Sequence, residues 1–333
     1  MIPTQNHLKQ NLNAIMPLFA VAYSLSVYLL FQQGDRQGYL DMLSVGFICV
    51  LPFVVGPLVV WFAPSRYRGS VAYALLAPSG AVLLFAAITA VFLGELWVCI
   101  VMASPIVLGL AAISGLATNA IRRRWRDDHN DTTMNAIVLF LLASPFAFTP
   151  LELKWEAPTA VYHVTTQIHI NATPDEVWQQ IIRVPRITPA EQRPSLFHLL
   201  GVPQPLEAQL VSEGVGGQRY GLFAGGLLFD ERITAWEPGR HIAFNITPRH
   251  TANTQLPLRQ IGGDVYDIRS AAYTIESVPE GGVMLYLEGG YSLTSHFNGY
   301  GRLWMDLIMR DFQNYVLQTV QQRAEAATSA NQR

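Results

Sequence analysis

Residues 298–325, NGYGRLWMDLIMRDFQNYVLQTVQQRAE, decide the fold of the second half of this chain. At about 100° per residue, a helix over this stretch gathers apolar side chains on one side and polar ones on the other. The apolar side consists of Tyr300, Trp304, Leu307, Ile308, Phe312, Tyr315 and Val316. Asp311 breaks the pattern, because it projects within about 30° of the middle of that side. Either Asp311 lies at the edge of the stripe, solvated or paired with an arginine, or it faces a cavity under the helix.

Composition divides the chain into two halves. The 333 residues are 50% hydrophobic and 14% charged, well below the roughly 25% charged residues usual in soluble domains. Residues 1–150 hold 8 basic and 6 acidic residues, whereas residues 151–333 hold 14 and 18, a net charge of −4. The second half is therefore composed like a soluble domain, without the basic surface that nucleic-acid binding needs. Cys49 and Cys99 both lie in apolar runs, so we expect no disulfide, metal site or cofactor.

Five apolar stretches in the first half predict membrane-spanning helices, because about 20 apolar residues cross a bilayer as a helix. They are residues 14–31, 42–63, 71–93, 96–117 and 134–148. The fifth stretch is short and contains Pro145, so it is the weakest of the five. No ionisable residue falls in the middle of a predicted span, and we expect this half to serve as an anchor.

Arginine placement predicts the orientation of these helices. Lys9, Arg66, Arg68 and the run 122–126 occupy the N-terminus and alternate loops, which places the N-terminus in the cytoplasm by the positive-inside rule. Five spans then put the C-terminal half on the outer side of a bacterial inner membrane. If residues 134–148 do not span, the C-terminal half is cytoplasmic instead.

The sequence of the second half predicts a folded domain at residues 162–325. A linker at 151–161 precedes this domain, and a tail at 326–333 follows it. A strand over 162–170 is followed by a helix that starts at a capping box, Thr173 with Glu176. A second short helix near residues 190–200 and six strand-like segments follow, separated by turns rich in glycine and proline. The six segments are 207–212, 218–223, 227–236, 241–247, 266–276 and 282–293. This order predicts an α+β domain in which a curved antiparallel sheet wraps around the long C-terminal helix and leaves a hollow.

Two motifs link this domain to a known superfamily. IHINATPDEVW at 168–178 and FDERITAWEPGRHIAF at 229–244, together with the terminal helix, resemble the START/polyketide-cyclase-like superfamily (SRPBCC), which has the helix-grip fold. The resemblance covers residues 162–325 and not the apolar half. It implies the fold more than one function, because the superfamily includes lipid carriers, hormone receptors and cyclases.

Strand alternation selects the side chains that should line the hollow. Apolar residues of the strands share their face with a few polar ones, and the terminal helix adds more. The candidates are Phe229, Glu231, Phe244, Arg269, Tyr273, Trp304, Asp311 and Tyr315. A few polar groups in an apolar hollow are typical of ligand sites. Alternatively, Arg269 pairs with Glu231 and Asp311 only to neutralise buried charge.

Three functions are compatible with this pattern. The first is a membrane-anchored protein that binds a hydrophobic small molecule or a membrane lipid under the terminal helix. The second is a cyclase- or dehydratase-like enzyme acting on a hydrophobic ketone or polyketide, with Glu231 or Asp311 as general acid or base and Tyr273 as a possible donor. The third is a structural or signalling module with no catalytic activity.

Overall fold

The computed structural model describes residues 15–35, 44–124, 131–152, 154–193, 195–251, 254, 258, 261–263 and 265–331. The chain divides into two compact units, Met1–Glu156 and Ala157–Arg333. The first unit is helical, and the second combines an antiparallel sheet with a long C-terminal helix.

Apolar helices make up the first unit. They are α2 (Met16–Asp35), a π-helical turn η1 (Gly46–Val50), α3 (Leu51–Trp61), a 3-10 turn η2 (Ser65–Tyr67), α4 (Val71–Phe92), α5 (Trp97–Arg124) and α6 (Asp131–Glu152). Each of the five predicted spans falls on this helical structure, although residues 14, 42 and 43 lie outside the described residues.

Two of these helices, α4 and α5, are long and apolar enough to cross a membrane. The other three apolar stretches, Met16–Gln32, Gly46–Trp61 and Ala136–Phe148, are shorter. The expectation of about five spans is therefore corrected to two. In α6 the first turn reads DTT, and such polar residues shorten the apolar stretch below the length that spans a bilayer.

Close helix contacts in this unit occur at glycines. A Cβ atom added at Gly56 of α3 would lie 2.0 Å from Ser114 Oγ, and one at Gly115 of α5 would lie 2.2 Å from the Ala74 carbonyl oxygen of α4. Small residues at such contacts let helix backbones approach closely, as they do between helices within membranes. These two glycines therefore allow α5 to pack closely against α3 and α4.

A seven-stranded antiparallel sheet forms the second unit, with strand order β1-β7-β6-β5-β4-β3-β2. The strands are β1 (Thr159–Ile170), β2 (Pro205–Leu210), β3 (Gln218–Phe223), β4 (Leu227–Glu237), β5 (His241–His250), β6 (Tyr266–Ser277) and β7 (Val283–Thr294). The helices are α7 (Pro174–Ile182), α8 (Leu196–Leu199) and α9 (Asn298–Asn331), and a 3-10 turn η3 (Ala224–Gly226) joins β3 to β4. The predicted α+β architecture is thus present, and α9 continues past Glu325 into the predicted tail.

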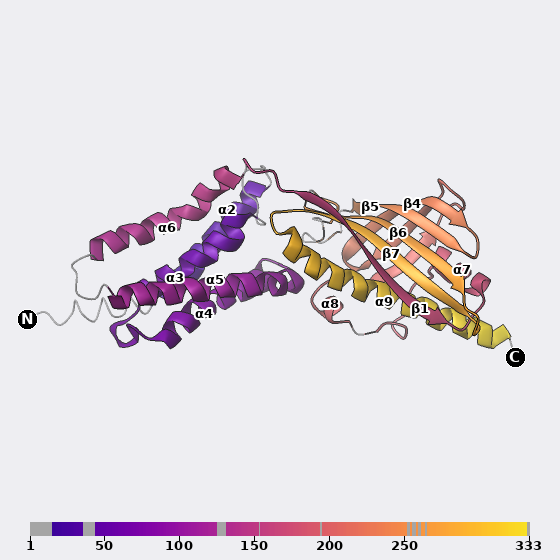
Figure 1. Ribbon diagram of the computed structural model, residues 1–333, viewed down its shortest axis with the longest axis horizontal. Helices are drawn as coiled ribbons and strands as arrows, with labels where there is room; N and C mark the ends of the chain where they lie inside the picture. Colours follow the sequence, from indigo (N-terminus) through magenta and orange to yellow (C-terminus); the bar gives the residue numbers. More distant parts are fainter. Residues whose placement is uncertain are drawn as a thin grey trace, which may run out of the picture. The chain divides into compact units, whose positions relative to one another are not determined.

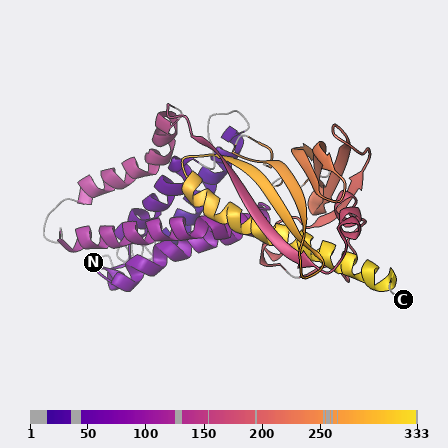
Figure 2. The same ribbon diagram turned by 45° about the vertical axis from the view of Figure 1, so that its right-hand side comes forward.

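The long helix α9 lies alongside β1 and β7, as both ribbon views show (Figure 1, Figure 2). One glycine of β7 matters for this contact: a Cβ added at Gly289 would lie 2.6 Å from Met309 Cε and 2.9 Å from Gln313 Nε2. Gln313 is buried and donates to the Val164 carbonyl oxygen at 2.9 Å. Glycine in β7 therefore allows α9 to come close enough to hydrogen-bond the backbone of β1.

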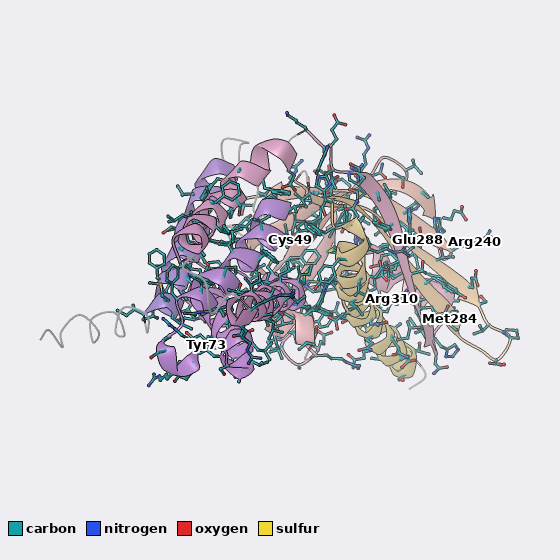
Figure 3. The ribbon with its side chains drawn as sticks, turned by 60° about the vertical axis from the view of Figure 1, so that its left-hand side comes forward. Cys49, Tyr73, Arg240, Met284, Glu288 and Arg310 are labelled. Atoms are coloured by element: carbon teal, nitrogen blue, oxygen red, sulfur yellow. The ribbon has the colours of Figure 1, made fainter. Side chains whose placement is uncertain are left out.

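The side of α9 that packs on the sheet differs from the predicted apolar side. The buried residues of α9 are Met309, Gln313, Tyr315, Leu317, Thr319, Val320 and Ala324. Of the predicted apolar side, Tyr315 is among them, whereas Leu307, which was expected to be covered, is 46% exposed. Asp311 is half-buried and lies beside these residues. Arg310 of α9 and Glu288 of β7 are both exposed (Figure 3).

Two clusters of apolar side chains lie between the sheet and the helices. The larger contains Val177, Trp178 and Ile181 of α7 with inward residues of β4 to β7 and Leu317 and Val320 of α9. The smaller contains Val164, Tyr291, Leu293 and Met309, with Tyr162, Tyr266 and Met305 packed against it. The predicted capping box is formed: the Thr173 side chain accepts from the Glu176 amide, and the Glu176 side chain accepts from the Thr173 amide.

Candidate functional site

Glu231 lies inside the second unit, where strand alternation places it. On β4, Phe229, Glu231 and Ile233 are all buried. Its partner is Arg219 of β3, which lies directly opposite in the β3–β4 register. Arg219 Nη1 donates to Glu231 Oε2, and both side chains are almost fully enclosed. The result is a buried ion pair on the inner face of the sheet.

The surroundings of this ion pair are apolar and aromatic. The Arg219 guanidinium lies over the Phe244 ring, with its carbon 4.9 Å from the ring centre, a favourable cation–π arrangement. On the other side, Gly221 leaves room for the carboxylate, because an added Cβ would lie 2.8 Å from Glu231 Oε1. Arg219 was not predicted from the sequence. Period-2 alternation along β3 together with its pairing to β4 was the signal that could have found it.

Burial dominates the electrostatics of this cluster. It raises the pKa of Glu231, against the opposing effect of Arg219, and it also raises the pKa of Tyr273 on β6. Tyr273 interacts with the same arginine. Arg219, Glu231, Tyr273 and Phe244 therefore form one polar–aromatic group, which we call the β3–β6 cluster. One donor in it is unused: Arg219 Nε is buried and has no hydrogen-bond partner.

Arg269 is outside this cluster, contrary to expectation. A bulge between Ile268 and Ser270 shifts the register with β7, and the extra residue reverses the side-chain alternation of β6 at that point. Arg269 is exposed, donates from Nε to Ser292 Oγ at 2.8 Å, and lies 3.8 Å from Asp267. Glu231 is thus neutralised by Arg219 and not by Arg269.

Phe229 connects the sheet to the helix through a second aromatic residue. Its ring meets that of Phe223 edge-to-face at 4.9 Å, and the Phe223 ring lies 5.7 Å from that of Phe312 on α9. This aromatic row brings the inner face of β3 and β4 against the middle of α9. It supplies the apolar surroundings that a ligand site needs.

Two of the three helix-borne candidates, Asp311 and Tyr315, meet α8 instead of the β3–β6 cluster, whereas the ring of Trp304 lies 6.5 Å from that of Tyr300. Asp311 accepts a hydrogen bond from Ser195 Oγ, the residue that caps α8. Four residues further along α9, the Tyr315 ring stands edge-to-face with that of His198 at 5.0 Å. Burial lowers the pKa of His198, and the nearby Asp311 carboxylate opposes that shift.

Two polar atoms at this contact have no partner. Among the described residues, the buried side-chain atoms without a hydrogen bond include His198 Nδ1 and Tyr315 Oη. Such atoms are uncommon in native structures and cost about 1–3 kcal/mol each. We call the contact of Ser195 and His198 with Asp311 and Tyr315 the α8–α9 junction. Its two α9 residues were predicted from the sequence, whereas the two on the α8 side were not.

Within the part of the chain that the structure describes, no group of three or more His, Cys, Asp or Glu side chains is arranged to hold a metal ion. Neither the β3–β6 cluster nor the α8–α9 junction presents such a group. The chemistry available at both places is hydrogen bonding and, at Glu231, proton exchange.

Comparison with known proteins gives similarity to solved structures alone. No protein-family model matches the chain, and no curated protein matches it. An uncharacterised protein from Rhizobium leguminosarum is 15% identical, with a TM-score of 0.31, over 50% of this chain and 99% of its own. The Zhui aromatase/cyclase from Streptomyces sp. R1128 is 16% identical, with a TM-score of 0.32, over 50% of this chain and 94% of its own.

DynU16, a protein of the dynemicin biosynthetic locus, is 16% identical, with a TM-score of 0.30, over 47% of this chain and 46% of its own. The solved structures that are similar to this chain thus include one aromatase/cyclase. Identities and TM-scores this low carry no argument about activity, which must rest on the residues of this chain.

Proposed function

We propose that the second unit binds an apolar small molecule or a membrane lipid between the sheet and α9, and that the first unit holds it at a membrane. The observation that carries the proposal is Arg219. This side chain is about 95% buried, is bound to Glu231 through Nη1, and keeps an unused donor at Nε. A buried arginine donor without a partner is costly, and the polar group of a bound molecule would remove that cost.

The aromatic row supports an apolar ligand. Phe223, Phe229 and Phe312 join the sheet to α9 next to the ion pair, and the Phe244 ring covers the guanidinium. An apolar molecule gains roughly 25 cal/mol for each Å² of surface that it buries. Such a molecule reaches a site more readily from a neighbouring bilayer than through water, which is why we couple the binding site to a membrane anchor.

The anchor is supported by α4 and α5. Only 22% of the most apolar window of each helix is buried, and large apolar side chains such as Leu76, Leu83 and Phe92 are exposed. A helix that is apolar on its exposed side is typical of a membrane span. We place this anchor in a bacterial inner membrane.

Orientation depends on α6. Arg66 and Arg68 precede α4, and Arg122 and Arg123 lie at the end of α5, so the positive-inside rule places these ends of the two helices in the cytoplasm. With α4 and α5 as the two crossings, we propose that the second unit lies on the cytoplasmic side, because an extracytoplasmic unit requires α6 as a further crossing. Fusions of alkaline phosphatase and of green fluorescent protein to the C-terminus test this, because the first is active outside and the second fluoresces inside. Phosphatase activity without fluorescence would place the unit outside and make α6 a third crossing.

The binding proposal is tested on the full chain, purified in detergent and returned to lipid nanodiscs. Native mass spectrometry should show one bound molecule per chain, and solvent extraction should identify it. Replacing the ion pair as a whole, Arg219→Met with Glu231→Leu, should lower ligand retention at least about tenfold, since it removes the donor without leaving a buried lone charge. The control is Arg269→Met, an exposed arginine of the same sheet, which should retain the ligand. A wild-type chain that carries no molecule in several lipid backgrounds would contradict the proposal.

A second candidate, a cyclase- or dehydratase-like enzyme, rests on Glu231. Its pKa is raised by burial, as in carboxyl groups that act as general acids. However, Arg219 already occupies Oε2. Glu231→Gln would separate the two functions: an enzyme loses turnover of a hydrophobic ketone while keeping its affinity, whereas a binding protein shows no turnover in either form.

A further inference from the structure

Four exposed leucines lie on α8 and on the first half of α9. They are Leu196 (66% exposed), Leu199 (77%), Leu303 (58%) and Leu307 (46%), and we call them the leucine patch. The two on α9 are four residues apart and so lie on the same side of the helix. Ser195 Oγ, next to the first leucine of α8, donates to Asp311, one helical turn after Leu307 (Figure 1). The α8 pair and the α9 pair therefore lie on neighbouring parts of one surface.

The helices that carry the leucine patch are fixed from the inside, so a small rotation cannot bury its leucines. Met309 and Gln313 occupy the side of α9 that faces the sheet, and two hydrogen bonds hold Gln313 there. The contact between the rings of His198 and Tyr315 holds α8 against α9. Contiguous exposed apolar surface of this kind marks an interaction site, so the partner must come from outside the second unit.

The covalent chain keeps the leucine patch close to the apolar first unit. The α6 helix ends at Glu152, whose carboxylate accepts from the Val45 amide at 2.8 Å, so this helix end is fixed to the other apolar helices. Residues 153–158 connect it to β1, and a chain of this length reaches at most about 25 Å. Asn298, the first residue of α9, donates to the carbonyl oxygen of Pro158. The half of α9 that carries the patch thus starts where this short connection ends.

The charges near the leucine patch suit a lipid surface. Arg302 and Arg310 are exposed and flank the α9 leucines. The two acidic residues between 298 and 311, Asp306 and Asp311, both accept hydrogen bonds within the unit. In the connection before β1, Trp155 is 67% exposed, and tryptophan is enriched at the level of the lipid headgroups. Exposed leucines between exposed arginines are typical of helices that lie in the membrane interface.

We propose that the leucine patch inserts into the surface of the bilayer that α4 and α5 cross, so that α8 and the first half of α9 lie at the headgroups. This inference rests on the membrane anchor of the proposed function and adds the surface by which the second unit contacts lipid. An apolar molecule that leaves the bilayer at this surface meets α8 and α9 without first being exposed to water.

A lipid with a photoreactive diazirine in its acyl chain tests the insertion. The full chain is reconstituted into nanodiscs of phosphatidylcholine and phosphatidylglycerol that contain this lipid, and the labelled peptides are identified by mass spectrometry after irradiation. Peptides with residues 196–199 and 303–307 should be labelled, together with those of α4 and α5. The control is the β2–β3 turn, where Val211 and Val215 are 64% and 71% exposed. This turn should be labelled at least about tenfold less, because acyl chains reach only groups within the bilayer and its interface.

The β2–β3 turn is a matched control because it is equally apolar and lies elsewhere on the unit. The Gly216 amide in this turn donates to the Ile233 carbonyl oxygen, and Ile233 belongs to the larger cluster around α7, whereas Met305 and Met309 beside the leucine patch belong to the smaller one.

Variants show whether the leucines cause the contact. Leu199→Asn with Leu303→Asn should lower the labelling of both patch peptides at least about fivefold and leave that of α4 unchanged, because apolar area drives interfacial binding. Val211→Asn with Val215→Asn should change neither. All four positions are exposed, so equal melting temperatures are expected and confirm that the variants fold.

The outcomes separate this inference from the proposed function. Labelled α4 and α5 with unlabelled patch peptides, or patch labelling that the leucine variants leave unchanged, would overturn the insertion and leave the anchor in place. If α4 and α5 are unlabelled as well, the anchor fails too. In the double variant Arg219→Met with Glu231→Leu, patch labelling should persist, because the bilayer and not the bound ligand supplies the probe. Its loss there would assign the labelling to the ligand and contradict the inference.

Discussion

On the side of α9 that packs against β1, Gln313 is buried and both ends of its amide are used: Nε2 donates to the Val164 carbonyl oxygen and Oε1 accepts from Thr166 Oγ1. On the side that meets α8, Tyr315 is equally buried, yet its hydroxyl has no partner. On one side of α9 the buried polar group has its hydrogen bonds, and on the other side it does not. This difference indicates a division of roles, because polar groups that stabilise the fold are paired within the chain, whereas groups that bind a ligand form their hydrogen bonds only with that ligand.

The largest loss of stability should come from removing the hydrogen bonds of Gln313. Gln313→Leu removes two hydrogen bonds and leaves the Val164 carbonyl without its side-chain partner, so we expect a loss of about 2–4 kcal/mol in the free energy of unfolding. Denaturant titration of the full chain, followed by tryptophan fluorescence, measures it. A change below 0.5 kcal/mol, within the usual range for surface substitutions, would mean that α9 is not fixed to β1 in this way.

Gly289→Ala should have the next largest effect. The added methyl group would meet Met309 Cε at 2.6 Å and Gln313 Nε2 at 2.9 Å, and pushing α9 away from the sheet costs about 1–3 kcal/mol. Gly299→Ala is the matched control, since nothing lies within 4 Å of its added Cβ and alanine favours a helix. The two melting temperatures should therefore shift in opposite directions, and equal shifts would contradict the close approach at Gly289.

Two buried tyrosines allow a sharper comparison. Tyr291 donates to Asp306 at 2.6 Å, so Tyr291→Phe should cost about 1–2 kcal/mol. Tyr315→Phe removes a hydroxyl that has no partner, and we expect a change within about 0.5 kcal/mol of zero or a slight gain. Both are measured by denaturant titration without added ligand. A large loss in Tyr315→Phe would show that its hydroxyl is already satisfied.

The smallest effect concerns pH. The pKa of His198 is lowered by burial and raised by Asp311. The folded state therefore favours the neutral ring, and its contribution to stability is complete above the unfolded pKa of about 6.5 and is lost as the pH falls below that value. Asp311→Asn should lower the His198 pKa further, as measured by NMR titration of the ring. A rise in the His198 pKa would contradict the conclusion that the Asp311 carboxylate raises it.

The sequence predicted most of the second unit because its signals are local. The capping box at Thr173 and the alternating strands are set by neighbouring residues, and the segments expected at 218–223 and 227–236 match β3 and β4 within one residue. The buried side of α9 was misjudged for the opposite reason. It contains Gln313, whose burial depends on the Val164 carbonyl oxygen of a strand far away in the sequence.

The same distinction explains the site. Glu231 and Tyr273 face inward because alternation is a local property, but the partner of Glu231 follows from the β3–β4 register, which no local pattern specifies. Arg269 was placed inside because a bulge of one residue leaves no clear mark on the sequence. Likewise, His198 reaches Tyr315 only through the tertiary contact between α8 and α9.

The bulge between Ile268 and Ser270 has a consequence for how the second unit moves. Before it, Tyr266 packs with Tyr291 and Met309, and after it Tyr273 packs with the larger group around α7. One strand therefore contributes to two separate apolar clusters, each of which is able to open on its own. Amide hydrogen exchange should show two distinct opening free energies along β6, one for the residues before Arg269 and one for those after it. The end near Tyr266 is then able to open for a ligand while the end near Tyr273 stays closed.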